Sequence, residues 1–423
     1  MEQDGRMFIL RIRPSVPKPA ATGAFWMNIL RLVVATVFLV ALLPRPGVAQ
    51  KQMLARLPPM GWSTWNHFHH DISDALIREE ADALVSSGMR DAGYVYVNID
   101  GGWEGYRDSS GVLHPNGNFP DMKALGDYIH ARGLKFGIYT GPGPETCGGA
   151  PASYGYEAQD AKMIASWGVD FLKYDLCTYR DIMKRESGGD TERSDALMIA
   201  AYQKMHRDLL ATGRSILFSL CQYGWGAVWK WGPQVGGNMW RTSGDISDNY
   251  DRMTSIGFRE AGLSAYAGPG HWNDPDILEV GNGGMTSDEQ RTHFGLWAML
   301  AAPLIAGNDL RNMDRETRSI LLNREVIAVD QDPLGKEGDR VDAEGPLEVW
   351  TKPLKGGDIA VALFNRITGS MRMTLALDRI GWRGPALARN LWTHNSAGEI
   401  RGSRTFTVPG HGIVMLRLQH PPH

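Results

Sequence analysis

Short apolar segments alternate with amphipathic stretches along most of the chain after its first fifty residues. The apolar segments have the length of strands, and we predict eight of them, at residues 60–65, 94–100, 135–140, 171–175, 215–220, 238–242, 265–268 and 303–307. Between them, apolar residues recur at three- and four-residue spacing, which predicts helices over stretches such as 73–89, 121–133, 195–213 and 288–300. Eight strand–helix units indicate a closed parallel (β/α)8 TIM barrel, an α/β fold. An open doubly wound sheet is the alternative, but no glycine-rich phosphate-binding loop follows the first strand.

The pattern changes from about Arg340 onward. Alternating polar and apolar residues predict further strands, separated by glycine, proline and asparagine, at residues 347–354, 358–365, 371–378 and 404–408. This alternation is typical of an antiparallel β-sandwich domain. We therefore predict three parts: an N-terminal extension with a signal peptide over 1–49, the barrel over 50–338 and the antiparallel β domain over 339–423.

The N-terminal extension contains a segment typical of a secretory signal. Arg31 precedes an apolar run over residues 32–43, and the small residues Gly47 and Ala49 are spaced as a cleavage site. A membrane anchor is the alternative, although such a run is short for crossing a bilayer. We expect a secreted or periplasmic protein.

Export would allow the three cysteines to form a disulfide, because exported proteins fold in an oxidising compartment. Cys147 and Cys177 both lie just beyond predicted strand ends, so they could bridge neighbouring loops and leave Cys221 alone. Three buried free thiols are the alternative.

Charge excludes one class of partner. The chain has 423 residues, a formal net charge of −3 and 22% charged residues, with no block of like charges. We therefore expect no nucleic-acid partner. We also expect no membrane partner once the signal has been cleaved.

Polar and aromatic residues gather at the carboxyl ends of the predicted strands, where barrels of this kind carry their chemistry. These residues are Trp65, Asp100, Tyr139, Lys173, Asp175, Arg241, Asp245, Trp272, Asp274 and Asp276. Packing alone does not account for so many of them at matching strand ends, so we predict a functional site there.

The segment FLKYDLC, residues 171–177, places Lys173 and Asp175 on the same side of a strand, because side chains alternate between its faces. A nearby ammonium favours the ionised form of a carboxylate. Asp175 would then be a nucleophile kept as an anion. The alternative is a partly buried salt bridge without chemistry.

Two carboxylates, two cations and several tryptophans suit a sugar, because aromatic rings stack on its apolar face while charged groups bind its hydroxyls. Glycoside hydrolysis needs one carboxylate that attacks and another that protonates the leaving oxygen. Asp175 fits the first role. Asp245 lies on a loop after another strand and could approach from the opposite side; the alternative is that it caps a following helix.

Six segments carry these residues in order: LPPMGWSTWNHF, YVYVNIDGGW, LKFGIYTGPGPETC, FLKYDLC, NMWRTSGDISD and GPGHWNDPDILEVG. They resemble the successive motifs of glycoside hydrolase family 27, the α-galactosidases and α-N-acetylgalactosaminidases. The resemblance runs from about Leu57 to the C-terminus. It implies a (β/α)8 barrel followed by an antiparallel β domain, and a retaining reaction through a covalent glycosyl-enzyme, with no cofactor and no metal.

The resemblance also implies roles for individual residues. Asp175 matches the nucleophile and Asp245 the general acid/base, so their carboxyl groups should lie about 5 Å apart. The positions implied to bind the sugar are Trp65, Asp100, Tyr139, Cys147, Lys173, Gln222, Arg241 and Asp276. A Cys147–Cys177 disulfide also matches the family, whereas Gly237 occupies the partner position of Cys221, so we expect no second bridge.

Two departures from the family pattern affect specificity. Gly101 follows Asp100 where the family usually has a second aspartate, which would contact the sugar around O4 and O6. Gln222 and Tyr223 follow Cys221 where α-galactosidases usually have glutamate and tryptophan, facing the 2-position. These residues are not obviously small enough to admit an N-acetyl group, so we expect an α-galactoside as the carbohydrate substrate. An α-N-acetylgalactosaminide and a β-L-arabinopyranoside are the alternatives within the family.

Two other hypotheses use the same residues differently. A sugar-binding protein without activity would require the loss of one carboxylate, and both are present. A metal-dependent hydrolase could be built on His67, His69, His70 and Asp71, but adjacent loop histidines rarely converge on one metal ion.

Overall fold

The computed structural model describes residues 53–422 of the chain. The predicted extension and signal peptide over 1–49 therefore lies outside the described residues. Within residues 53–422, no helix combines the length and apolar character that a membrane span requires.

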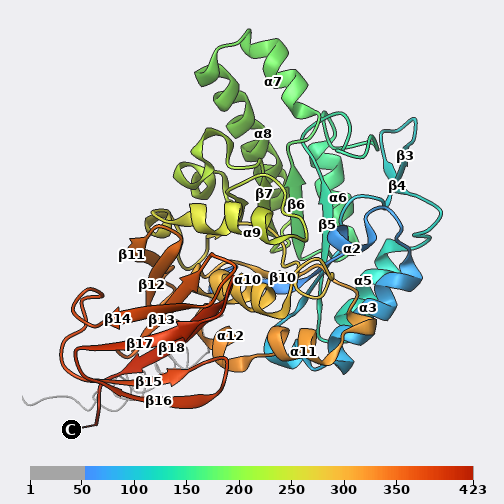
Figure 1. Ribbon diagram of the computed structural model, residues 1–423. Coiled ribbons are helices and arrows are strands. Elements are labelled where there is room, and N and C mark those ends of the chain that lie inside the picture. The colour runs from blue at the N-terminus through green and yellow to red at the C-terminus, as the bar shows by residue number, and fades with distance from the viewer. Residues whose placement is uncertain (1–52, 423) are drawn as a thin grey trace, which may run out of the picture. The chain divides into compact units, whose positions relative to one another are not determined.

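Eight parallel strands form the barrel (Figure 1). In chain order they are β1 (Met60–Ser63), β2 (Tyr96–Asn98), β5 (Lys135–Thr140), β6 (Phe171–Asp175), β7 (Leu217–Cys221), β8 (Met239–Arg241), β9 (Trp272–Asp274) and β10 (Leu304–Ala306). They pair in the order β10-β1-β2-β5-β6-β7-β8-β9. The ring closes just beyond β9, where the Leu278 amide donates to the Ile305 carbonyl at 2.8 Å and the Gly307 amide donates to the Leu278 carbonyl at 3.0 Å.

The predicted helices lie between these strands, and several begin at side chains that cap them. The larger ones are α3 (Asp74–Ser86), α5 (Met122–His130), α6 (Glu157–Ser166), α7 (Tyr179–Ser187), α8 (Thr191–Ala211), α9 (Tyr250–Gly257), α10 (Ser287–Met299), α11 (Arg315–Leu321) and α12 (Arg324–Asp330). Ser73 and Asp121 cap α3 and α5 by accepting hydrogen bonds from backbone amides. Thr286 and Glu289 form a reciprocal capping box at the start of α10.

Strand β6 shows how alternation sorts side chains between the barrel interior and the surrounding helices. Leu172 and Tyr174 belong to the large core outside the barrel, and the Tyr174 ring lies edge-on to Tyr202 of α8, with centroids 5.7 Å apart. Phe171 points inward and belongs to a small apolar cluster with Tyr96, Leu217, Met239, Trp272 and Ala301. Lys173 and Asp175 follow Phe171 on the inward face, toward the carboxyl end.

The predicted seventh strand was misplaced. Ser264–Tyr266 form a short 3₁₀ helix, and the strand of this unit is β9, which begins at Trp272. A turn over 268–271 separates the two, with the Gly268 amide bonded to the His271 carbonyl at 2.8 Å and Gly270 at φ 98°. Proline followed by glycine at the centre of a turn favours this geometry and ends a strand. Trp272 is consequently at the amino end of β9, in the apolar cluster, rather than in the site.

The C-terminal domain is an antiparallel β-sandwich, as predicted. One sheet has the order β11-β12-β13-β18-β15-β16, and β14 pairs with β17 beside it. The strands are β11 (Asp339–Glu344), β12 (Leu347–Pro353), β13 (Ile359–Asn365), β14 (Met371–Ala376), β15 (Ala386–Asn390), β16 (Asn395–Ile400), β17 (Ser403–Val408) and β18 (Ile413–Gln419). Four of them, β11, β15, β16 and β18, were not predicted.

Strand β13 joins the two hydrophobic cores. Val361 and Leu363 belong to the core of the sandwich, whereas Phe364 belongs to the core that surrounds the barrel. The Phe364 ring lies edge-on to Phe258, with centroids 5.1 Å apart. Both faces of β13 are thus buried, which explains why its sequence is almost continuously apolar.

Candidate active site

A cavity lies at the carboxyl ends of the barrel strands and the loops that follow them. Every predicted catalytic or binding residue except Gln222 lines it: Trp65, Asp100, Tyr139, Cys147, Lys173, Asp175, Arg241, Asp245 and Asp276. Trp65 reaches the cavity from α2 (Trp65–Phe68), because β1 ends at Ser63, two residues earlier than predicted. Parallel strands bring their carboxyl ends together at one end of the barrel. Residues that are far apart in the sequence consequently line the same cavity.

Lys173 forms its ion pair with Asp100 rather than with Asp175. Its ammonium donates to Asp100 Oδ2 at 2.8 Å, and the Gly101 amide donates to Asp100 Oδ1 at the same distance. Burial alone would lower the pKa of Lys173, but the nearby carboxylates, led by Asp100, raise it well above its usual value. Lys173 therefore remains protonated. Its ion-pair partner is Asp100, which follows β2, and not Asp175.

Asp175 is a buried carboxylate that accepts a hydrogen bond from a phenolic hydroxyl. Its side chain is 5% exposed, and the Tyr223 hydroxyl donates to its Oδ1 at 2.6 Å. Burial raises the pKa of Asp175, while the Lys173 ammonium and the Tyr223 hydrogen bond act in the opposite direction. Burial and nearby ionisable groups raise the pKa of Tyr223 far above its usual value, so its hydroxyl retains the donated proton.

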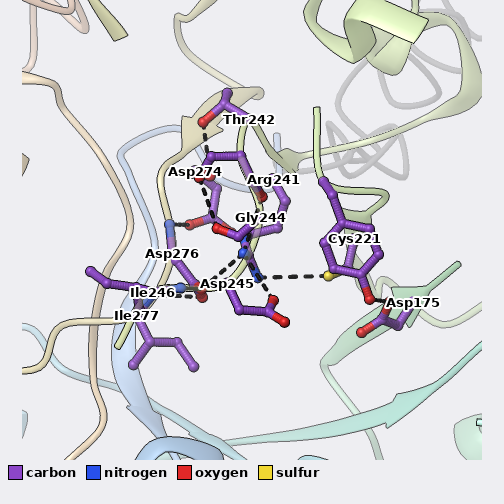
Figure 2. A network of polar contacts seen from close by, with 12 residues as sticks. Asp175, Cys221, Arg241, Thr242, Gly244, Asp245, Ile246, Asp274, Asp276 and Ile277 are labelled. Carbon is purple, nitrogen blue, oxygen red and sulfur yellow. Dashed lines mark hydrogen bonds and ion pairs between the residues drawn. The ribbon is translucent and has the colours of Figure 1, made fainter. Parts of the chain in front are cut away.

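Arg241, the last residue of β8, connects two further carboxylates (Figure 2). Its Nη2 lies 2.8 Å from Asp276 Oδ2 and 3.1 Å from Asp245 Oδ1. Asp276 has φ 103°, and its Oδ2 also accepts a hydrogen bond from the Ile246 amide at 2.8 Å. A non-glycine residue in this region of φ is strained, so the surrounding contacts must hold it.

Asp245 differs from Asp175 in its exposure to solvent. Its side chain is 71% exposed, and its backbone carbonyl accepts a hydrogen bond from Arg252 Nε at 2.6 Å. The alternative that Asp245 caps a helix is wrong, because α9 is capped by Asn249, which accepts a hydrogen bond from the Arg252 amide. The Asp245 carboxylate is therefore left facing the cavity.

The structure contains the Cys147–Cys177 disulfide, which lies against Asp175 and two tyrosines. The two sulfur atoms and a carboxylate oxygen of Asp175 lie within 4.8 Å of one another. Tyr139 Oη lies 3.2 Å from Cys177 Sγ, and Tyr223 Oη lies 3.6 Å from Cys147 Sγ. The disulfide thus fixes the loops after β5 and β6 around the buried carboxylate. Cys221 is a buried free thiol.

Gln222 does not line the cavity. Its side chain is fully buried, and Nε2 donates to the Arg241 carbonyl at 3.2 Å. The next residue, Tyr223, occupies the wall instead, because β7 ends at Cys221 and the backbone of Tyr223 turns to φ 61°. The resemblance implied that Gln222 faces the 2-position of the sugar, but in this structure Tyr223, and not Gln222, lines the cavity.

The family models match nearly all of the described chain. Residues 57–332 match the model for alpha galactosidase A, and residues 344–418 match the alpha galactosidase C-terminal beta sandwich domain. This chain belongs to the α-galactosidase family, glycoside hydrolase family 27. It is a glycoside hydrolase.

Three members of this α-galactosidase family illustrate its range. The alpha-galactosidase of Cyamopsis tetragonoloba is 45% identical over 371 residues, which cover 86% of this chain and 87% of that protein. Alpha-galactosidase I from Mortierella vinacea superimposes with a TM-score of 0.80 at 36% identity, covering 86% of this chain and 98% of that one. A β-L-arabinopyranosidase from Geobacillus stearothermophilus gives a TM-score of 0.74 at 26% identity, covering 86% and 97%.

The cavity of this family member includes residues that the sequence analysis did not assign to the sugar. They are Asn66, His70, Gly148, Ile246 and Ile277; Gly101 and Tyr223, which the resemblance placed near the sugar, also line the cavity. All of them lie outside the strands, where alternation gives no signal. Of the histidine-rich segment, only His70 lines the cavity. Within residues 53–422, the one group of side chains close enough to hold a metal ion is Cys147, Asp175 and Cys177, and its two sulfurs are joined in the disulfide.

The charge of the cavity suits a reaction that develops positive charge on a sugar. When all groups are ionised, four carboxylates face two cations: Asp100, Asp175, Asp245 and Asp276 against Lys173 and Arg241. Fixed negative charge in a partly desolvated site stabilises an oxocarbenium-like transition state more than its neutral precursor. The cavity also contains two carboxyl groups in different surroundings, Asp175 buried and Asp245 exposed. Such a pair suits a reaction that needs two carboxyl groups in different roles.

The Tyr223 hydroxyl should determine the acid limb of the pH–rate profile. If Asp175 is the nucleophile, its carboxyl group must be ionised to attack, so kcat/KM should fall as the pH drops through its pKa. Tyr223→Phe removes a donor that stabilises the anion, and we expect the limb to move to higher pH by about one unit. Tyr139→Phe is the control, since its hydroxyl contacts Cys177 rather than Asp175. An acid limb that stays in place in the Tyr223 variant would refute this role.

Proposed function

We propose that the protein is a retaining α-galactosidase that releases terminal non-reducing α-D-galactose, with Asp175 as nucleophile and Asp245 as general acid/base. The observation that carries the proposal is the pairing in one cavity of a buried carboxylate with a hydroxyl donor and an exposed carboxylate from a different loop. The names of the relatives support galactose as the sugar.

In the first step, the Asp175 carboxylate attacks the anomeric carbon and forms a covalent ester with the sugar. Asp245 gives its proton to the glycosidic oxygen as the bond between that oxygen and the anomeric carbon breaks, so the leaving group departs as a neutral alcohol. The departing alcohol can leave through the mouth of the cavity, because the side chain that protonates it is largely exposed.

In the second step, Asp245, now a carboxylate, takes a proton from water as the water oxygen attacks the anomeric carbon. The ester bond to Asp175 breaks, and the carboxylate regains its electron pair. The Tyr223 hydroxyl and the Lys173 ammonium stabilise that anion when it is released. Two inversions give net retention.

The remaining polar groups would hold the hydroxyls of the sugar in fixed positions. With the anomeric carbon between Asp175 and Asp245, Asp100 and Lys173 bind ring hydroxyls, and the Asp100–Gly101 wall faces the end of the ring that carries C4 and the C5 hydroxymethyl group. Arg241 and Asp276 orient Asp245 through their ion pairs.

A pentopyranosidase activity is the second candidate, and Gly101 favours it. Gly101 leaves the cavity wall without a carboxylate, and the Geobacillus stearothermophilus relative is a β-L-arabinopyranosidase. Such a sugar has the galactose ring without its hydroxymethyl group. An N-acetyl group would have to fit beside Tyr223, whose ring occupies the wall next to Asp175.

Three chromogenic substrates distinguish these activities: p-nitrophenyl α-D-galactoside, α-N-acetylgalactosaminide and β-L-arabinopyranoside. We expect the highest kcat/KM on the galactoside, roughly tenfold or more above the arabinopyranoside, as the loss of a bound hydroxyl would predict. The measurement is initial rate against concentration at fixed pH. A preference for either other glycoside would overturn the choice of galactose, and no hydrolysis of any of them would overturn the proposed function.

We also propose that the protein is exported, into the periplasm or out of the cell. The apolar run after Arg31 and the disulfide beside Asp175 support an oxidising compartment. Expression of the full chain in a bacterial host, followed by N-terminal sequencing of the fraction outside the cytoplasm, should show a mature chain that begins at Gln50. Full-length protein confined to the cytoplasm would contradict export.

A further inference from the structure

His70 lies in the wall of the active-site cavity, beside Gly101, and takes no part in the proposed double displacement. Its side chain is exposed to the cavity and to solvent. No hydrogen bond joins its ring nitrogens to another residue of the described part of the chain. A neutral imidazole offers one donor and one acceptor, which matches a sugar hydroxyl.

The backbone before His70 directs its ring toward the cavity. His69 follows α2 with φ 48° and ψ −118°, and its amide donates to the Trp65 carbonyl at 3.0 Å. This reversal brings the His70 ring edge-on to Trp65, with centroids 5.1 Å apart and an angle of 88° between the planes. A strained turn at a non-glycine residue is maintained only when its surroundings hold it, and sites of function are where such turns gather.

Glycines surround the imidazole on its other sides. A Cβ atom on Gly148 would lie 2.7 Å from His70 Cε1 and 3.2 Å from Nε2, and one on Gly102 would lie 3.3 Å from Nδ1. Gly102 has φ 114° and needs to be glycine for its backbone, but Gly148 does not, so the histidine itself accounts for the missing side chain at 148. The ring occupies a slot that ordinary side chains would close.

Gly101 leaves the space beside the His70 ring open to the cavity. A Cβ atom there would lie 3.4 Å from Tyr139 Cε1 and 3.9 Å from His70 Cε1, which are ordinary contacts, so glycine is not required by crowding. Its effect is instead to leave the His70 ring accessible from the cavity. The neighbouring Asp100 oxygens are already bonded to the Gly101 amide and to Lys173.

We propose that His70 is a specificity-determining residue that hydrogen-bonds the C5 hydroxymethyl group of the bound hexopyranoside. This inference rests on the orientation of the sugar in the proposed function. The His70 imidazole comes from the loop after α2. It supplies the hydrogen bond to the hydroxymethyl group that Gly101, which has no side chain, does not supply. Selection of a hexose over the corresponding pentose then depends on His70.

His70→Phe tests the proposal, because it keeps a ring against Trp65 and removes both nitrogens. We expect kcat/KM on p-nitrophenyl α-D-galactoside to fall about tenfold, mainly through KM, while the β-L-arabinopyranoside changes by less than about twofold, because the pentose has no hydroxymethyl group to lose. The ratio of the two values is the readout. His70→Gln, which retains a donor and an acceptor, should keep most of the wild-type ratio.

His69→Asn is the matched control. His69 also lies edge-on to Trp65, at 5.4 Å, but does not line the cavity, and asparagine tolerates its positive φ. We expect both substrates to be hydrolysed as by the wild type. Equal losses on the two substrates in His70→Phe, which leave their ratio unchanged, would overturn the role of His70. Wild-type protein inactive on both glycosides would instead overturn the proposed function.

Discussion

The proposed mechanism depends on one electrostatic constraint: the carboxylate of Asp175 is buried and yet must be an anion to attack the sugar. Burial opposes its ionisation, and the Lys173 ammonium, the Tyr223 hydroxyl and the Arg241 guanidinium counter that effect. Neither cation is free to neutralise Asp175 completely, because Lys173 is bonded to Asp100 and Arg241 to Asp276. The Asp175 carboxylate is therefore stabilised by surrounding charge while the two cations are paired with other carboxylates, and its Oδ1 accepts the Tyr223 hydrogen bond.

Contacts well outside the cavity hold the charged groups around Asp175 in place. Helix α10 packs between the barrel and the sandwich, and its Trp297 Nε1 donates to the Asp276 carbonyl at 2.8 Å. Near the middle of the same helix, the Thr292 hydroxyl donates to the His411 carbonyl at 2.7 Å, between β17 and β18 of the sandwich. The strained backbone of Asp276, and through it the position of Arg241, is thus supported by the packing of the C-terminal domain.

Much of this could be predicted where the chain is regular. The bounds of β5 and β6 agree with the sequence pattern, because apolar alternation is a direct consequence of a strand's two faces. The prediction failed where loops determine position. Lys173 was expected to act on Asp175 directly, but Asp100, which lies two residues beyond the end of β2, binds its ammonium. The resemblance implied a sugar contact for Gln222, but the backbone turns to a positive φ at Tyr223, and it is the Tyr223 side chain that lines the cavity. His70 could not be assigned to the cavity either, since its place depends on an equally irregular turn at His69.

The most direct test of the central claim is the configuration of the product that an Asp175→Ala variant forms when azide replaces its missing carboxylate. If Asp175 is the nucleophile, azide enters the space of its side chain and attacks an activated α-galactoside from the β face, so NMR of the product should show β-galactosyl azide. The corresponding Asp245→Ala variant should give the α anomer, since azide then replaces water in the second step. An Asp175→Ala variant that hydrolyses the galactoside at a near-normal rate, or that gives α-galactosyl azide, would contradict the assignment of Asp175 as the nucleophile.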